Sequence, residues 1–260
     1  MRRLIFAQAH RAMIFNEPSL FSYPEWMTIP FIIQPRNAHQ YLADILLAIP
    51  GCISLTGMTG SMSRFFSTPI PSRVDLQPVQ ERTAQLLHDL SQWADENPHL
   101  TCVSAGPMIV TPELGRAVSG AVMTSSGSLT STVVLPDTFI ALTAATYEAV
   151  RLILTLLQHK ISPRPAKSPS VAVDQNTPPH SPLPLLIASA TTYARSILEI
   201  VTFLESTHPV GFDFMRSVFP LVVVAILGPE AEEQNSALDM MERWGESRGV
   251  GGLCGAWISA

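Results

Sequence analysis

Apolar side chains recur along most of this chain with the spacing of amphipathic helices. The clearest stripe runs through 186–204, where apolar residues return every three or four positions and so share one helix face. Similar stripes run through 76–94, which ends before Asn97-Pro98, and through 37–49. The apolar positions are Leu186, Ala190, Tyr193, Ala194, Ile197, Ile200, Val201 and Leu204; Leu76, Val79, Leu86, Leu87, Leu90 and Trp93; and Ala38, Tyr41, Leu42, Ile45, Leu46 and Ile49.

Four more segments are predicted to be helical. Residues 1–16 carry apolar residues toward both ends, and 136–159 begins with a proline, which the first turn of a helix tolerates. Residues 212–227 are apolar nearly all round, as in a central helix, and Pro220 is expected to kink that helix. Residues 230–245 begin with glutamates and end near arginine, which complements the helix dipole.

The intervening segments are predicted to be loops. Residues 97–134 are rich in Ser, Thr and Gly, with one short helix expected near 113–123. Residues 161–184 are rich in proline and should form a flexible insert, so that deleting 163–179 would cost little stability. Because no long period-two pattern occurs, the sequence predicts an all-α fold: one domain spanning 1–260, built as an irregular helical bundle or array with proline-rich loops.

Composition narrows the functional classes. The chain is 47% hydrophobic and 14% charged with a net charge of −5, which argues against a nucleic-acid binder with a basic face. Its longest apolar stretch, 139–157, contains Glu148 and Arg151, so a buried amphipathic helix is favoured over a membrane span. The apolar run that follows the two N-terminal arginines is too short for a signal peptide, so an intracellular protein is expected.

No motif for catalysis, metal binding or cofactor binding emerges from the sequence. Cys52, Cys102 and Cys254 are widely separated and are interpreted as reduced, buried thiols. The seven histidines lack zinc-site spacing and are expected at the surface or at helix caps. The glycine-rich segment 249–255 lacks the last glycine of a dinucleotide-binding loop and is interpreted as a helix stop and flexible tail. The prediction is therefore a protein that is not an enzyme and has no catalytic residue, cofactor or metal.

Tryptophans and paired carboxylates are interpreted first as structural. Trp244 is predicted to be a core anchor on the face that carries Leu238 and Met241, and Trp93 and Trp257 are expected to be core anchors too. Glu232-Glu233 is expected on a solvated helix face. A small-molecule pocket stays open as an alternative, with a predicted lining of Trp26, Tyr147 and Phe139.

The segment 22–50 combines unusual features. Trp26 lies between Pro24 and Pro30, which indicates a rigid loop that holds the indole beneath it as an apolar anchor. A helix that has Asp44 at its centre and ends at Pro50 is predicted to follow, and its continuation to 66 across Pro50 and Gly51 is left open. This arrangement resembles the C-terminal regulatory domain of fungal zinc binuclear cluster transcription factors. The matching positions are Trp26, Thr28, Pro30, Asp44 and Ile49-Pro50.

Two later segments extend the resemblance. Residues 135–139 with Ala144 and Tyr147 are similar to the family's middle segment, and 229–249 is similar to its last long helix. The resemblance implies a nuclear, pathway-specific transcription regulator, for example of secondary metabolism. The six-cysteine cluster of the family does not occur in this chain. Zinc binding and direct DNA binding are therefore not carried over to any residue here.

The sequence thus predicts a regulator that acts through protein contacts, with a related transcription factor or coregulator as partner and without its own DNA-binding head. A dimer and a small-molecule effector are left open. Its only basic cluster, Lys160, Arg164 and Lys167, is interrupted by prolines and offers no recognition element for duplex DNA. The alternatives are an all-α small-molecule-binding protein or accessory enzyme with an apolar pocket, and a membrane-associated accessory protein.

Overall fold

The computed structural model describes residues 2–32, 36–101, 138–162, 183–207, 212–248 and 251–258. Within these ranges the chain forms ten α-helices, three 3-10 helices and no strand, so the predicted all-α class is confirmed. The α-helices are α1 (Arg2–Phe15), α2 (Pro24–Thr28), α3 (Ala38–Ser54), α4 (Met62–Ser67), α5 (Gln77–Glu96), α6 (Thr138–Ile161), α7 (Leu183–Thr207), α8 (Phe212–Leu227), α9 (Ala231–Arg248) and α10 (Gly251–Ile258). The 3-10 helices are η1 (Leu20–Ser22), η2 (Ile29–Phe31) and η3 (Pro98–Leu100).

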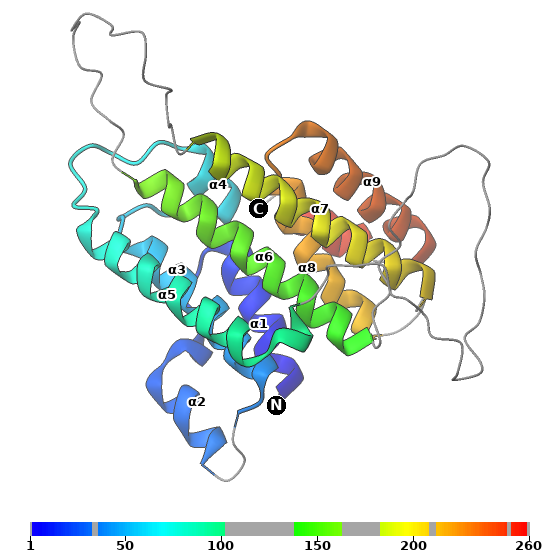
Figure 1. Cartoon of the computed structure of the whole chain (residues 1–260), viewed down its shortest axis with the longest axis horizontal. Coiled ribbons are helices and arrows are strands. Elements are labelled where there is room, and N and C mark those ends of the chain that lie inside the picture. The colour runs from blue at the N-terminus through cyan, green and yellow to red at the C-terminus, as the bar shows by residue number, and fades with distance from the viewer. Residues whose placement is uncertain are drawn as a thin grey trace, which may run out of the picture.

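Helix α6 is the element around which the others pack. It contacts α3, α5, α7 and α8, and Figure 1 shows α7 and α5 running along it on either side. Of the described helices, α6 is the one long and apolar enough to cross a bilayer, yet 78% of its most apolar window is buried inside the protein. Its burial is that of a core helix, as the sequence predicts for this segment.

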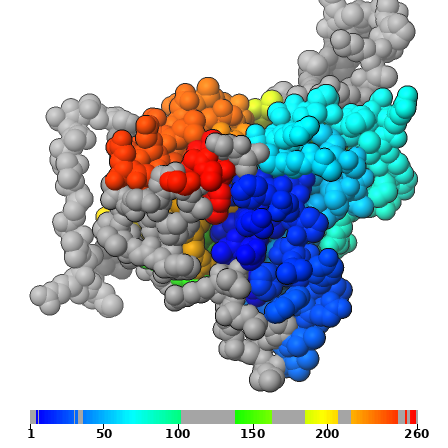
Figure 2. Space-filling view, turned by 180° about the vertical axis from the view of Figure 1, so that it is seen from behind, coloured from blue at the N-terminus to red at the C-terminus, as the bar shows by residue number. Residues whose placement is uncertain are grey.

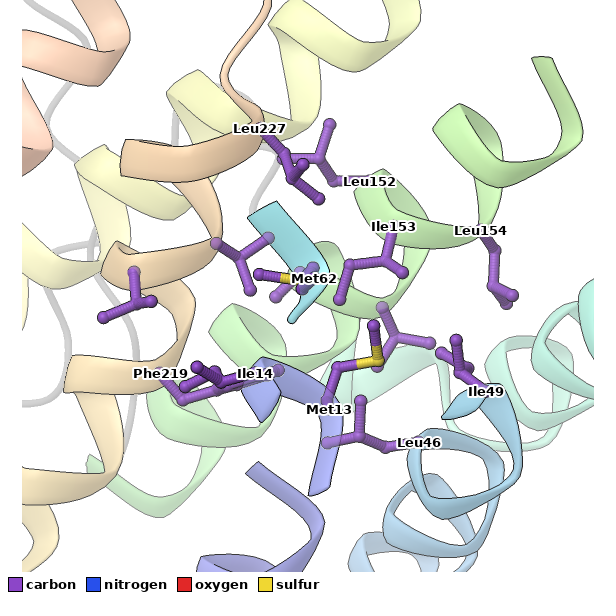
Figure 3. Close-up of a cluster of buried hydrophobic side chains, with 14 of the residues drawn as sticks. Met13, Ile14, Leu46, Ile49, Met62, Leu152, Ile153, Leu154, Phe219 and Leu227 are labelled. Carbon is purple, nitrogen blue, oxygen red and sulfur yellow. The ribbon is translucent and has the colours of Figure 1, made fainter. Parts of the chain in front are cut away.

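One hydrophobic cluster joins helices from both ends of the chain. Side chains from α1, α3, α4, α6 and α8 meet in its centre (Figure 3). Burying each large aliphatic side chain contributes roughly 1.5–3 kcal/mol, so this cluster supplies much of the driving force for folding. The side chains labelled there are Met13, Ile14, Leu46, Ile49, Met62, Leu152, Ile153, Leu154, Phe219 and Leu227.

Helix α3 begins with a capping box and runs past its internal proline. Asn37 and Gln40 each accept a hydrogen bond from the other's backbone N–H, at 2.9 Å. Of the two ends considered for this helix, the end at Pro50 is wrong: α3 continues across Pro50 and Gly51 and ends at Ser54, short of 66. Cys52 and Ile53 lie beyond the proline and are buried, and burying Ile53 offsets about the 3 kcal/mol that an internal proline costs. Helix α8 likewise continues through Pro220.

Three loop predictions are changed or lie beyond the described residues. The ends of the predicted insert 161–184 are helical, because Ile161 closes α6 and α7 begins at Leu183. Its interior, 163–182, lies outside the described residues, as does 102–134 with the short helix expected there. The predicted flexible tail is wrong, because 251–258 form α10, which packs on α8 and α9.

Trp244 is fully buried in the core, as predicted, together with Met241. Its indole Nε1–H donates a hydrogen bond to Glu205 Oε1 at 2.9 Å, which joins α9 to α7. Leu238 does not share this face as predicted; it is 37% exposed. Six residues along an α-helix leave Leu238 about 120° away from Trp244 around the axis.

We expect Trp244→Ala to lower the free energy of unfolding by roughly 3–5 kcal/mol, because it leaves a large cavity in the core and removes the hydrogen bond to Glu205. The matched control is Leu238→Ala, on the same helix but exposed, which should change stability by less than about 1 kcal/mol. Urea denaturation followed by circular dichroism measures both. Equal, small losses for the two variants would contradict the assigned burial of Trp244.

Candidate functional site

The segment between α1 and α3 projects from the helical body as an N-terminal arm, residues 19–32. It consists of η1, α2 and η2 in succession, and no residue of η1 or α2 is buried. Figure 1 shows the arm extending away from α6, and Figure 2 shows it as a blue protrusion at the lower edge of the molecule. The arm is therefore the most exposed ordered element in the described N-terminal part of the chain.

Five large apolar residues of the arm are exposed to solvent and form what we call the apolar stripe. They occur at every third position along the arm, so each is about one helical turn from the next. Backbone N–H groups of Tyr23 and Trp26 donate to the carbonyls of Leu20 and Tyr23, respectively, so the exposed residues are themselves linked turn by turn. The stripe consists of Leu20, Tyr23, Trp26, Ile29 and Ile32, which are 70%, 54%, 42%, 62% and 77% exposed.

Contacts at the base of the arm hold it on α3. The guanidinium of Arg36 lies 4.5 Å from the ring centroid of Phe31 and 5.7 Å from that of Tyr41, and it pairs with Asp44 at 2.8 Å. Burial raises the pKa of Asp44 to about 6, against the opposing effect of Arg36. The base is thus fastened by a cation–π sandwich and an ion pair, while the stripe stays outside these contacts.

The sequence-based prediction for Trp26 is wrong. Trp26 lies on a short exposed helix, where its ring makes an edge-to-face contact with Phe21 at 5.3 Å, and it is not anchored beneath a loop. Pro24 occupies the first turn of α2, where a missing N–H has no cost, so the proline starts a helix. Tyr41, predicted on the buried face of its helix, is also exposed, beside Arg36.

A buried polar cluster lies between α6 and α7. The Arg151 guanidinium lies 3.3 Å and 3.4 Å from the two carboxyl oxygens of Glu148, and it donates to the Tyr193 hydroxyl at 3.0 Å. It also lies over the rings of Tyr193 and Tyr147, whose far side stacks on Trp93. Burial of Glu148 raises the pKa of its carboxyl to about 7, although Arg151 acts in the opposite direction.

Two histidines predicted at the surface are instead buried. His10 stacks on Phe219 with ring centroids 4.2 Å apart, and burial, aided by the charge of Arg216, lowers the pKa of His10 to about 3. Burial and then Arg216 lower the pKa of His39 to about 2. Both imidazoles are therefore neutral at physiological pH. His88 and His99 are exposed as predicted, whereas 180 and 208 lie outside the described residues.

His39 is held by a relay of hydrogen bonds across three helices. Because the Arg216 guanidinium donates to His39 Nε2, the neutral ring carries its proton on Nδ1. That N–H donates to Thr143 Oγ1 at 3.2 Å, and the Thr143 hydroxyl donates to the Phe139 carbonyl at 2.8 Å. The relay connects α3 to α6 and α8. It gives hydrogen-bond partners to polar groups that would otherwise be buried without one, at a cost in stability.

Other charged residues predicted to be solvated form structural contacts. Glu233 is buried, accepts the backbone N–H of Glu230 and pairs with Arg195 of α7 at 3.1 Å, which corrects the expected solvated face. Lys160 donates to two carbonyls at the end of α4, those of Phe66 and Thr68. The remaining two members of the predicted basic cluster, at 164 and 167, lie outside the described residues.

The predicted pocket lining is not brought together. Phe139 and Tyr147 are eight residues apart on α6, about 12 Å along the axis; Phe139 packs beside His39, and Tyr147 packs against Trp93. Trp26 lies on the arm. Among the described residues no group of three or more His, Cys, Asp or Glu side chains could hold a metal ion, and Cys52 is a buried free thiol, as predicted for it.

No protein-family model, curated protein or solved structure matches this chain. The candidate site is therefore defined by its geometry. It is the exposed apolar stripe on the arm, whereas the polar clusters form their hydrogen bonds within the helical body. The period of three in 20–32 is visible in the sequence, and it is the signal that could have located the stripe.

We expect Glu148→Gln to change the pH dependence of stability. The folded-state pKa of Glu148 lies near 7, above the ordinary value of 4.5, so the folded state binds the proton more tightly than the unfolded chain. The stability that the neutral carboxyl contributes is present below about pH 4.5 and is lost as pH rises toward 7. As pH rises between these two values, wild type should lose roughly 2–3 kcal/mol of its free energy of unfolding, a loss that the Gln variant should not show.

Urea denaturation at a series of pH values measures this difference between the two proteins. Tyr193→Phe is the control, because it removes a hydrogen bond to Arg151 without removing a carboxyl. This control should change the free energy of unfolding by the same amount at every pH, so that its dependence on pH stays that of wild type. Parallel profiles for wild type and Glu148→Gln would contradict the raised pKa.

Proposed function

We propose that this chain is a nuclear, pathway-specific regulator of transcription that acts by binding another protein through its N-terminal arm. The observation that supports protein contact is the apolar stripe. With roughly 150–250 Å² for a large side chain, the exposed fractions of its five residues amount to about 600 Å² of apolar surface. So much exposed apolar surface within one short segment supports an interaction site there.

The chemistry of the stripe favours a protein partner. Tyrosine and tryptophan are enriched at the energetic centres of protein interfaces, and charged residues are depleted there. Between residues 18 and 35 the sequence contains one charged residue, Glu25. The partner surface should therefore be apolar and should present a groove or helix face to Trp26.

The assignment to transcription rests on the resemblance to the regulatory domain of zinc binuclear cluster factors. The net charge of −5 and the engagement of Lys160 with backbone carbonyls favour a role in which the partner, and not this chain, reads the DNA sequence. Regulation would then pass by protein contact to a DNA-bound protein.

The Glu148 cluster is the observation that favours the enzyme alternative, because a carboxyl that titrates near pH 7 suits a general acid. However, Glu148 is buried, and both its oxygens lie within 3.4 Å of the Arg151 guanidinium. Because the carboxyl is committed to an ion pair with a neighbouring residue of the same helix, we favour a structural role for it.

Fusing this chain to an unrelated DNA-binding domain tests the regulatory proposal in a reporter assay. The fusion should change transcription from the reporter relative to the DNA-binding domain alone. The double variant Trp26→Ser/Ile29→Ser should abolish this change, because it removes the centre of the stripe. Leu55→Ser/Leu238→Ser, at exposed apolar positions outside the arm, should retain it. A fusion without effect, or an equal effect from all variants, would contradict the proposal.

Purified chain should show no preference for promoter fragments over scrambled duplex at about physiological salt. Fluorescence anisotropy with labelled duplexes and unlabelled competitor measures this ratio. Any residual binding should be weak, equal for both sequences and lost as salt rises, because only scattered cations are present. A clear preference for one sequence would show that the chain itself reads DNA.

A further inference from the structure

We propose that the surface that covers the apolar stripe is the same stripe on a second copy of this chain, in a dimer with two-fold symmetry. This inference rests on the proposed function in one respect: it names the occupant of the same arm. A two-fold interface brings one patch against itself, so the patch must be self-complementary. A stripe of Leu, Tyr, Trp and Ile meets that condition, because apolar contacts need no partner of opposite charge.

The area of the stripe matches what such a dimer needs. Each arm offers about 600 Å² of exposed apolar side chain, so pairing two arms would bury at most about 1,200 Å². That area is at the lower limit of specific protein interfaces, and the body of the protein need not contribute. Interfaces of this size form reversible complexes, so the dimer should exchange with monomer as concentration falls.

The geometry of the arm leaves room for a second copy. The arm projects from the helical body, which leaves it accessible to a second copy (Figures 1 and 2). Its base is already fastened by Arg36 to Phe31, Tyr41 and Asp44, so little conformational entropy is lost on pairing. Trp26 is the third of the five stripe residues, which places it next to the two-fold axis.

The charges near the stripe favour a second copy over a lipid surface. Glu25 is the one charged residue between 18 and 35, and the nearby cations Arg11 and Arg36 are paired with Glu17 and Asp44. An anionic membrane attracts clusters of free Lys and Arg, which the arm does not provide. In an arm-to-arm pair, Glu25 lies about 100° around the helix from Trp26, at the rim, where water can solvate both carboxylates.

Multi-angle light scattering of the full chain, from about 1 to 100 μM, tests the dimer. Wild type should shift from monomer to dimer mass over this range. Trp26→Lys and Trp26→Glu should each stay monomeric, because like charges would meet at the axis, and an equimolar mixture of the two should recover the dimer. Leu55→Lys, at an exposed apolar position outside the arm, should dimerise as wild type does. Circular dichroism checks that every variant is folded.

A wild-type protein that stays monomeric at about 100 μM would overturn the inference. A dimer insensitive to both Trp26 variants would overturn it too, and so would stripe-dependent sedimentation with phosphatidylcholine vesicles. The inference and the proposed function fail separately. A monomer whose reporter effect depends on the stripe would overturn the dimer and leave regulation standing. A stripe-dependent dimer without a reporter effect would overturn the proposed regulation and leave the dimer standing.

Discussion

The burial of α6 over most of its surface is the constraint on which the rest of the structure depends. Its small residues, such as Ala145 and Ala149, let neighbouring helices approach closely, and its large ones, such as Ile153, fill the common core. Because α3, α5, α7 and α8 each contact α6, helices distant in sequence are placed around one axis. A helix buried in this way must also accommodate its own polar residues.

The polar residues within the core are accommodated by pairing across helices. Glu148 is tolerated because Arg151, one turn along α6, donates to it, and Arg151 also donates to the Tyr193 hydroxyl of α7. His39 is tolerated because Arg216 and Thr143 engage both of its ring nitrogens. Removing one partner of such a group costs more than the group contributes, so these clusters specify how the helices meet. These clusters form their hydrogen bonds within the helical body, whereas the arm presents apolar side chains to solvent.

The sequence predicts those features that depend on local periodicity. Val79 and Leu90 lie on the buried face of α5, and Ile197 on that of α7, because burial follows the 3.6-residue period of a helix. Prediction from the sequence fails where the burial of a residue depends on another residue far away in the chain. His39 is buried because Arg216, 177 residues later, donates to it, and no local pattern contains that pair.

Proline and tryptophan were misinterpreted for a related reason. Local rules place a helix end at Pro50, but the burial of Ile53 beyond it outweighs the lost backbone hydrogen bond. The flanking Pro24 and Pro30 predict a rigid loop with Trp26 held beneath it, whereas the five-residue helix that carries Trp26 has no buried residue. A functional surface is a departure from the rule that apolar residues are buried, so a rule based on burial misplaces it.

The central claim is that the stripe is ordered, exposed in the free chain and covered on association. The chain has four tryptophans, and of these Trp26 lies on the arm, whereas Trp93 and Trp244 are buried. Fluorine NMR of the chain labelled with 5-fluorotryptophan reports on each indole separately. The account predicts that the Trp26 resonance, assigned with Trp26→Phe, shifts as protein concentration rises, while those of Trp93 and Trp244 stay constant. A Trp26 resonance that does not change with concentration, or that already matches a buried indole in dilute solution, would contradict it.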